Sequence, residues 1–494
     1  MTEPIRTTVA GSRIRAVALA DLLGHWAGAD GPLYRLLATR IARLADTGEL
    51  APGLRLPAER ELAAALSMSR NTVAAAYQLL RDEGMADSRQ GAGTRIVPHR
   101  TTPAAVHRAN GFFTLRLEAS DVVADLSVAT VDCAPQVVAA LTEPASVLGR
   151  AAMREVTQST GYFPHGLPVL REAIASHLTH RLGLLAGPEQ VLVTTGGQQA
   201  IDLLVRSELL PGQAAVVEDP TFPGVVDALH RAGASLIGVA AADGLDPDRL
   251  EHVVRTHRPA LVYLILTHHN PTGLVMPASH RAQIARLAAR NPDTLFVDDV
   301  TLAELGLRDA PLPPPLASCT QQPVPNLVTI GSFSKVCWGG LRTGWVCASR
   351  GLIGRLAAVK SAADLGSNAF GQAVMAALLD SSHDGIVKWR RDWLRTRHAA
   401  LTGSLARHLP EWSWPAPDGG LTLWVRLPDG VDGGIFAQAA LRRGVAVVPG
   451  RLLSAAASPS ADRHIRLAYT QAPETLAGAA VTLAQVQESL TRPR

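Results

Sequence analysis

The first hundred residues carry helical stripes of apolar side chains separated by short polar breaks. Leucines and an isoleucine recur at the spacing of one helix face over residues 32–46, and shorter stripes follow over residues 59–66 and 70–83. Residues 85–97 then alternate around a glycine-rich tip, which predicts a two-stranded hairpin. The order of helix, helix, short turn, helix and hairpin is that of a winged helix-turn-helix.

From about residue 121 onward the pattern changes to short β-branched runs, such as "QVLVTT", "ALVYLILT" and "NLVTIGS", that alternate with helical stretches rich in Ala, Leu and Arg. This alternation predicts an α/β domain with a mainly parallel sheet covered by helices. We therefore expect four segments, namely an arm over residues 1–30, a winged helix-turn-helix over 31–97, a linker over 98–120 and an α/β domain over 121–494.

Composition narrows the class of protein. The chain has 494 residues with 47 basic and 43 acidic side chains, a formal charge of +4, and only four cysteines. The cysteines lack CxxC or zinc-like spacing, which favours a reducing compartment and no metal. Residues 1–30 lack the apolar stretch of a signal peptide, and no uncharged apolar run reaches the roughly 18 residues of a membrane span. We expect a cytoplasmic protein with no membrane partner.

The predicted helix-turn-helix offers side chains suited to double-stranded DNA. The N-terminal residues of its last helix would lie at base edges in the major groove, where Arg can bind guanine and Asn can bind adenine. A three-helix unit with an apolar core also occurs outside DNA-binding proteins, so the pattern alone leaves DNA binding open. The candidate DNA contacts are Arg60, Ser69, Arg70, Asn71, Thr72, Gln90 and Gly91.

The α/β domain offers the groups that pyridoxal 5′-phosphate (PLP) requires. This cofactor needs a lysine, a carboxylate at its pyridine nitrogen, and N–H groups, hydroxyls and an Arg for its phosphate. Taken singly, the candidates have ordinary structural explanations, such as a turn for a glycine pair or a helix cap for an Asp. As a set they follow the order a PLP site needs: Gly196, Gly197, Gln198, Phe222, Asn270, Asp298, Ser332, Ser334, Lys335, Arg342 and, for a substrate carboxylate, Arg466.

Two stretches resemble known families. The motifs "G-x-x-LP-x-ER-x-LA", "SR-x-TV" and "GxG" in residues 32–97 resemble the GntR-family winged helix-turn-helix, and the seven candidate DNA contacts match its DNA-contacting positions. Residues from about 125 to 475, with "HHNPTG", "LFVDD" and "GSFSKVCWGGLRTGW", resemble the fold-type-I, aspartate aminotransferase-like PLP enzymes. A head and a domain of these kinds in one chain are similar to the MocR subfamily of transcriptional regulators.

The second resemblance implies roles and an architecture. Lys335 would be the Schiff-base lysine, Asp298 the partner of the pyridinium, Asn270 the donor to O3′ of PLP and Phe222 the stacking ring. The phosphate cup and the carboxylate clamp would be formed by Gly197, Gln198, Ser332, Ser334, Arg342 and Arg466. It also implies a large part over about residues 150–375, a small part over about 376–494 and a head-to-tail homodimer.

The sequence departs from this family at two points. Val300 and Thr301 stand where many members have a Tyr that donates to O3′ of PLP, and of the two only Thr301 can donate. Gly339 and Gly340 replace a Pro that often follows the lysine. The second contact to O3′ is therefore an open question.

Three functions follow as hypotheses. The first is a PLP-dependent, sequence-specific transcriptional regulator that senses an amino compound or PLP. The second is a working aminotransferase with an appended DNA-binding head, which the retained Asn270, Asp298, Lys335 and Arg466 support. The third is a PLP-binding scaffold without transcriptional output.

Overall fold

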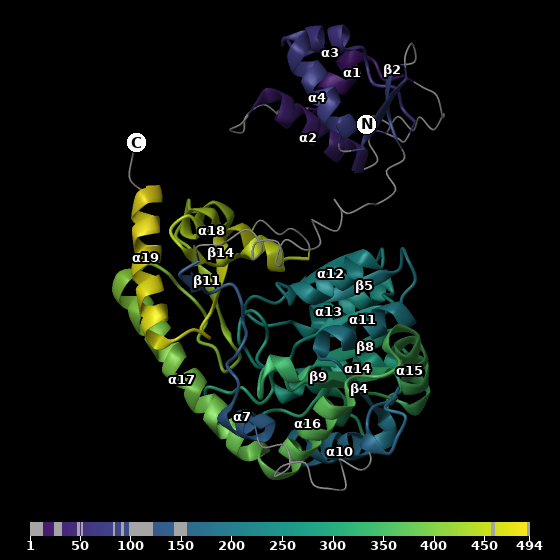
Figure 1. Cartoon of the computed structure of the whole chain (residues 1–494), viewed down its shortest axis with the longest axis vertical. Coiled ribbons are helices and arrows are strands. Elements are labelled where there is room, and N and C mark those ends of the chain that lie inside the picture. The colour runs from purple at the N-terminus through teal and green to yellow at the C-terminus, as the bar shows by residue number, and fades with distance from the viewer. Residues whose placement is uncertain are drawn as a thin grey trace. The chain divides into compact units, whose positions relative to one another are not determined.

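The computed structural model in Figure 1 describes residues 13–23, 32–46, 50, 53–82, 84–89, 93–97, 122–142, 156–455 and 460–491. The chain divides into two compact units, residues 1–108 and 109–494. A helical first unit and an α/β second unit confirm the fold class expected from the sequence. Across the described ranges, no helix combines the length and the apolar character needed to cross a membrane.

The described part of the first unit consists of four helices and a hairpin. Its elements are α1 (Ala16–Leu23), α2 (Leu33–Asp46), α3 (Glu59–Ala65), α4 (Arg70–Asp82), β1 (Ala86–Arg89) and β2 (Gly93–Ile96). The predicted stripes meet in one core, where Leu37 of α2 and Val73 of α4 are fully buried. The buried Tyr77 hydroxyl donates to the Pro57 carbonyl at 3.0 Å and so fixes α4 to the segment that precedes α3.

Helix α1 lies in the stretch that we expected to be an arm. Its Leu19 and Leu23 are buried in the same core as α2 and α4. The sequence AVALADLL is apolar at nearly every position, so it has no polar face to contrast with a buried one. Periodicity therefore gives no signal for this helix, although burial stabilises it.

The second unit is built on a seven-stranded sheet in the order β4-β10-β9-β8-β7-β5-β6. All neighbouring pairs are parallel except those of β10, which is antiparallel to both β4 and β9. A short connection joins β9 to β10 and carries no crossover helix, which accounts for the reversal. The strands are β4 (Val191–Thr194), β5 (Ala214–Asp219), β6 (Ser235–Ala240), β7 (Leu261–Leu264), β8 (Leu295–Asp299), β9 (Leu327–Ser332) and β10 (Gly344–Cys347).

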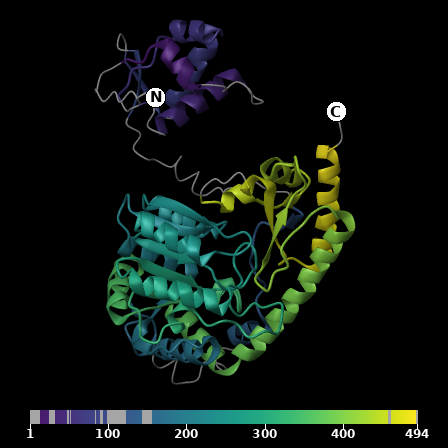
Figure 2. The same cartoon turned by 180° about the vertical axis from the view of Figure 1, so that it is seen from behind.

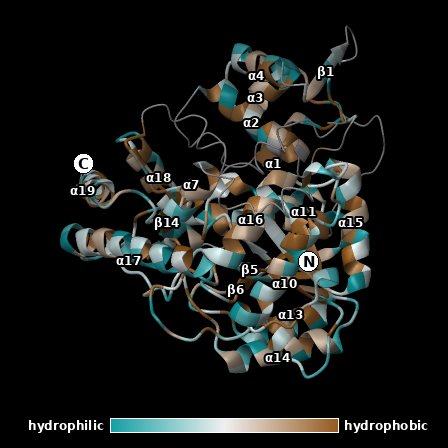
Figure 3. Cartoon of the chain, turned by 60° about the horizontal axis from the view of Figure 1, so that its bottom comes forward, coloured by the Kyte–Doolittle hydropathy of each residue, from teal (hydrophilic) through white to brown (hydrophobic). Residues whose placement is uncertain are grey.

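Helices cover both faces of this sheet (Figure 3), so its inner strands are buried on both sides, whereas the edge strand β6 is partly exposed. Along β8, Phe296 packs with the helices of one face and Val297 with those of the other. One face carries α11 (Gly197–Glu208), α12 (Pro223–Arg231) and α15 (Arg350–Asp364); the other carries α13 (Pro247–His257) and α14 (Ala278–Arg290). Further helices, α10 (Pro168–Leu182) and α16 (Ala369–Ser381), pack together beside β4.

The C-terminal part forms a smaller α/β layer. Its main sheet has the order β11-β14-β13, with β11 (Thr422–Arg426), β14 (His464–Ala468) and β13 (Val448–Pro449), and α18 (Gly433–Leu441) packs nearby. The 26-residue α17 (His383–His408) runs along one side of the unit and packs against α19 (Pro473–Thr491), as Figure 2 shows.

A segment from before the large sheet also joins this C-terminal part. β3 (Ala124–Asp125) pairs in parallel with β12 (Val445–Ala446), and α7 (Pro135–Thr142) follows it. The backbone between β3 and α7 supplies carbonyl groups to the site described below.

Candidate functional site

The candidate residues of the second unit lie where the strands end. Gly196 and Gly197 follow β4, Phe222 follows β5, Asn270 follows β7 and Asp298 lies near the end of β8. Ser332 is the last residue of β9, Ser334 and Lys335 follow it, and Arg342 lies two residues before the antiparallel β10. Because the carboxyl ends of parallel strands share one edge, and β10 starts at that edge, the fold brings these residues to one side of the sheet.

A group of donors surrounds the N-terminus of α11. Gly196 has a φ of 114°, a conformation that favours glycine, and a Cβ placed on it would lie 3.6 Å from Arg342 Nη2 and 3.7 Å from Ser332 Oγ. The Ser332 and Ser334 hydroxyls lie 3.0 Å apart. Backbone N–H groups of a helix start, two hydroxyls and a guanidinium together form a donor set suited to a phosphate.

Gln198 and Phe222 meet beside this helix start. The Gln198 Nε2 donates to the Gly224 carbonyl at 3.0 Å. A Cβ at Gly224 would overlap both the Gln198 amide and the Phe222 ring, so only glycine permits this packing. The half-buried Phe222 is the N-cap residue of α12.

Asp298 is a fully buried carboxylate with one uncommitted oxygen. Its Oδ2 accepts from the Leu316 amide at 2.9 Å, whereas its Oδ1 has no hydrogen-bond partner. Burial raises the pKa of Asp298, and the Arg281 guanidinium acts in the opposite direction. A buried acceptor without a partner is costly unless a ligand supplies a donor. Asn270 Oδ1 is likewise buried without a partner.

The Lys335 amine lies among cations. Its Nζ donates to the Ala129 carbonyl at 2.7 Å. Burial, together with the positive charges of Arg466 and Arg342, lowers its pKa to about 8. A lysine in this environment is a much better nucleophile near neutral pH than an ordinary one.

Arg466 reaches the same place from the small sheet. It is only 1% exposed, lies opposite Trp424 in the β11–β14 pair, and donates to the Ser127 carbonyl. Burial lowers its pKa to about 10. Its guanidinium is therefore a desolvated cation, which binds a carboxylate more strongly than an exposed one would.

Thr301 occupies the position at which the sequence departs from the family. Its backbone N–H donates to Asp299 Oδ1 at 2.9 Å, and a Cβ placed on Gly197 would lie 3.4 Å from its Oγ1. The Thr301 hydroxyl is thus close to the start of α11.

Taken together, this arrangement fits PLP. The donors near α11 suit the phosphate, the free oxygen of Asp298 suits a protonated ring nitrogen, and Lys335 supplies an amine of low pKa. Among the described residues, no hydrogen bond joins Asp298 or Asn270 to Lys335.

The candidate DNA contacts belong to the first unit. Ser69 Oγ accepts from the Thr72 amide at 3.1 Å, so Ser69 is the N-cap of α4. Arg70 and Asn71 are exposed at the start of α4, and Arg70 Nε lies 3.2 Å from Glu59 Oε2. Arg60 is exposed on α3. Gln90 and Gly91 lie outside the described residues.

The sequence reasoning missed two buried arginines that hold the site. Arg281 donates to the Leu266, Met276 and Pro314 carbonyls and to Thr267 Oγ1, and its charge acts on Asp298. Arg390 donates to the carbonyls of Val336 and Cys337, directly after Lys335, and to that of Asp132. One signal was available for each, since both interrupt an apolar helix stripe at a buried position.

Comparisons with known proteins agree with this geometry. Residues 125–483 match the model of the family described as aminotransferase class I and II, and residues 33–96 match that of the bacterial regulatory proteins of the gntR family.

Similar proteins include regulators and an enzyme. YisV of Bacillus subtilis, described as an uncharacterized HTH-type transcriptional regulator, is 28% identical over 90% of this chain and 93% of its own length. PdxR of Corynebacterium glutamicum, an HTH-type pyridoxine biosynthesis transcriptional regulator, is 31% identical over 63% of this chain and 65% of its own. The crystal structure of LysN, the alpha-aminoadipate aminotransferase of Thermus thermophilus, in complex with N-(5′-phosphopyridoxyl)-L-leucine, is 28% identical, has a TM-score of 0.66 and covers 78% of this chain and 97% of its own.

Proposed function

Because the chain belongs to the aminotransferase class I and II family and carries a gntR-type DNA-binding head, we propose that it is a PLP-dependent transcriptional regulator of the MocR type. Its aminotransferase-like part would sense an amino compound or PLP, and its head would bind a specific DNA operator. The observation that carries the proposal is the presence in one chain of an exposed α4 start, with Arg70 and Asn71, and of a cluster of buried polar groups suited to PLP. The similarity to YisV and PdxR supports it.

In this proposal each candidate site residue of the second unit has a role in binding the cofactor. The amide groups of Gly196, Gly197 and Gln198 and the side chains of Ser332, Ser334 and Arg342 bind its phosphate. Asp298 keeps the pyridine nitrogen protonated, and bound PLP then supplies an electron sink. Asn270 and Thr301 donate to its ring oxygen, and Phe222 stacks on the ring.

Two residues select the effector. The low pKa of Lys335 leaves on the order of a tenth of its amine uncharged at pH 7, which allows covalent attachment of an aldehyde. Arg466, buried and cationic, binds a carboxylate. An effector with both an amine and a carboxylate, such as an amino acid, satisfies both residues.

Regulation requires that the effector bind two states with different affinity. We propose a head-to-tail homodimer in which effector binding changes the spacing of two DNA-binding heads. The segments proposed are an arm (1–30), a head (31–97), a linker (98–120) and a PLP-binding domain (121–494) with a large part (about 150–375) and a small part (about 376–494). Because its proposed partner is a DNA operator, we propose that the protein acts in the cytoplasm.

The proposal is tested with the purified full-length protein and DNA from the region upstream of its own gene and neighbouring genes. We expect a sequence-specific gel shift that responds to PLP and to one class of amino compound. A visible absorption titration with amino acids and amines identifies that class. If the protein binds no upstream site specifically, either with or without PLP, the regulator hypothesis is refuted.

A working aminotransferase is the second candidate, because Asn270, Asp298, Lys335 and Arg466 are retained and LysN shares the fold. Steady multiple turnovers of an amino acid with a 2-oxo acid, lost in Lys335→Ala, would favour it. Exchange without turnover would favour the regulator.

A further inference from the structure

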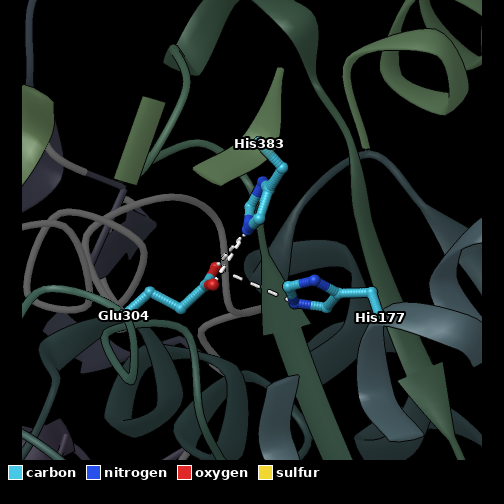
Figure 4. Close-up of side chains that lie close together, drawn as sticks. All are labelled: His177, Glu304 and His383. Atoms are coloured by element: carbon cyan, nitrogen blue, oxygen red, sulfur yellow. Dashed lines mark hydrogen bonds and ion pairs between the residues drawn. The ribbon is translucent and has the colours of Figure 1, made fainter. Parts of the chain in front are cut away.

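Three polar side chains from distant parts of the chain meet next to Thr301 and Ser332 of the proposed PLP site. His177 lies in α10, Glu304 follows β8, and His383 is the first residue of α17. Figure 4 shows both imidazoles directed at the Glu304 carboxylate. One ligand atom of each residue lies within 4.8 Å of the others.

Hydrogen bonding accounts for only part of this cluster. His383 Nε2 lies 2.8 and 3.0 Å from the two oxygens of Glu304, so the two residues are hydrogen-bonded. His177 Nε2 is 3.8 Å from Glu304 Oε2, too far for a hydrogen bond, although His177 is only 8% exposed. A second imidazole beside a carboxylate, without a hydrogen bond to it, matches a cation site better than a simple ion pair.

The charged groups beside the cluster also bear on a cation. Glu304 is its one carboxylate, and both imidazoles lie next to it. Arg181, 4.0 Å from Glu304, would repel a metal ion, but its guanidinium is paired with Asp384 at 2.9 Å.

The two separations between the carboxylate and the imidazoles are compatible with a tetrahedral ion. Zinc binds imidazole nitrogen and carboxylate oxygen at about 2.0–2.2 Å, which places tetrahedral ligands roughly 3.4 Å apart. The carboxylate-to-imidazole separations of 2.8 and 3.8 Å bracket that value. Shifts of about half an ångström would equalise them, and such shifts are within the reach of side-chain torsions.

A very small cavity adjoins two of the three side chains. His177 and Glu304 line it together with Thr301 and Ser332, which belong to the proposed PLP site. Phe333, two residues before Lys335, packs edge-on against both imidazoles, with ring centroids 5.7 and 6.3 Å apart. An ion here would tie α10, the segment after β8 and α17 around the loop that carries Lys335.

We propose that His177, Glu304 and His383 form a binding site for one divalent transition-metal ion, of which zinc best matches the two-imidazole, one-carboxylate ligand set. Magnesium and calcium prefer oxygen ligands and bind it weakly. The three ligands lie far apart in the sequence, so ligand spacing could not reveal the site.

The experiment uses the untagged, full-length protein loaded with PLP, freed of unbound PLP and dialysed against a chelator. Zinc is added in competition with a chromophoric chelator, and bound metal is counted by elemental analysis. We expect one zinc per chain in the wild type. His180→Ala is the matched control, because His180 is exposed on the same helix and bonds to Ser176.

Two variants decide the outcome. His177→Ala should lose the bound zinc, and Glu304→Gln, which keeps the size of the side chain, should weaken zinc binding by at least about 100-fold. Zinc should raise the melting temperature of the wild type and of His180→Ala but not that of Glu304→Gln. If the wild type and Glu304→Gln bind the same number of zinc ions with equal affinity, or the wild type binds none, the cluster is a hydrogen-bond network and the metal site is refuted.

Discussion

The low pKa of the Lys335 amine leads to a quantitative prediction. Attachment of PLP requires the uncharged amine, so the rate of attachment should rise with pH and level off near the pKa of about 8. At pH 7 a lysine of pKa 8 is uncharged about one time in ten, whereas one of pKa 10.5 is uncharged about once in three thousand. The site should therefore react roughly 300-fold faster at pH 7 than an ordinary lysine would.

Arg466→Met tests the electrostatic part of this effect. Burial is the larger cause of the low pKa and stays in place, while one of two neighbouring positive charges is removed. The pKa of Lys335 should rise, and the rate at pH 7 should fall by several-fold, well short of 300-fold. Arg466→Lys keeps the charge and should leave the inflection near that of the wild type.

The assay follows visible absorption after PLP is mixed with cofactor-free protein between pH 6 and 11. Far-ultraviolet circular dichroism confirms that each variant is folded. A wild-type profile that inflects near 10.5 would contradict the assignment of a buried, cation-flanked amine. Identical profiles for Arg466→Met and Arg466→Lys would show that Arg466 does not act on Lys335.

Three further predictions concern stability and DNA binding. In denaturant titrations at pH 7, Lys335→Met should raise the free energy of unfolding of the cofactor-free protein by at most about 3 kcal/mol, because the wild type must bury a charged amine below pH 8. The difference between variant and wild type should vanish above about pH 10.5, where the Lys335 amine is neutral in both the folded and the unfolded state. Arg70→Ala should weaken specific operator binding by about 1–3 kcal/mol in fluorescence anisotropy, whereas Gln78→Ala, an exposed change later in α4, should not; equal losses would remove Arg70 from base recognition. Tyr77→Phe should destabilise the DNA-binding head by about 1 kcal/mol or more in thermal melts, because the Pro57 carbonyl loses its donor, and an unchanged melting temperature would show that this bond adds no stability.

Local sequence patterns predicted much of the fold. The stripes of α2 and α4 and the β-branched runs of the large sheet are regular, so the fold class, with its helical N-terminal region and mainly parallel sheet, was expected and is confirmed. Motifs at strand ends likewise placed Asp298 and Lys335 at one edge of the sheet. These positions were predictable because a strand and the turn that follows it are contiguous in the sequence.

Long-range pairing was not predictable in the same way. Arg281 and Arg390 donate hydrogen bonds to backbone carbonyls of several distant segments, so the sequence of any one segment does not reveal these contacts. The contacts among His177, Glu304 and His383 depend on the packing of α10 against the segments around it. Helix α1 was missed for a different reason, since a stretch that is apolar at nearly every position has no clear periodicity to detect.

The length of α17 has a mechanical consequence. A helix of 26 residues spans about 39 Å and resists bending over that distance. Arg390 anchors it to the peptide groups after Lys335, and its far end packs on α19. Pivoting by about 5° at this anchor would carry the far end, about 27 Å away, through roughly 2 Å. A small tilt of α17 at Arg390 would therefore produce a much larger displacement where the helix packs on α19 than beside the peptide groups after Lys335.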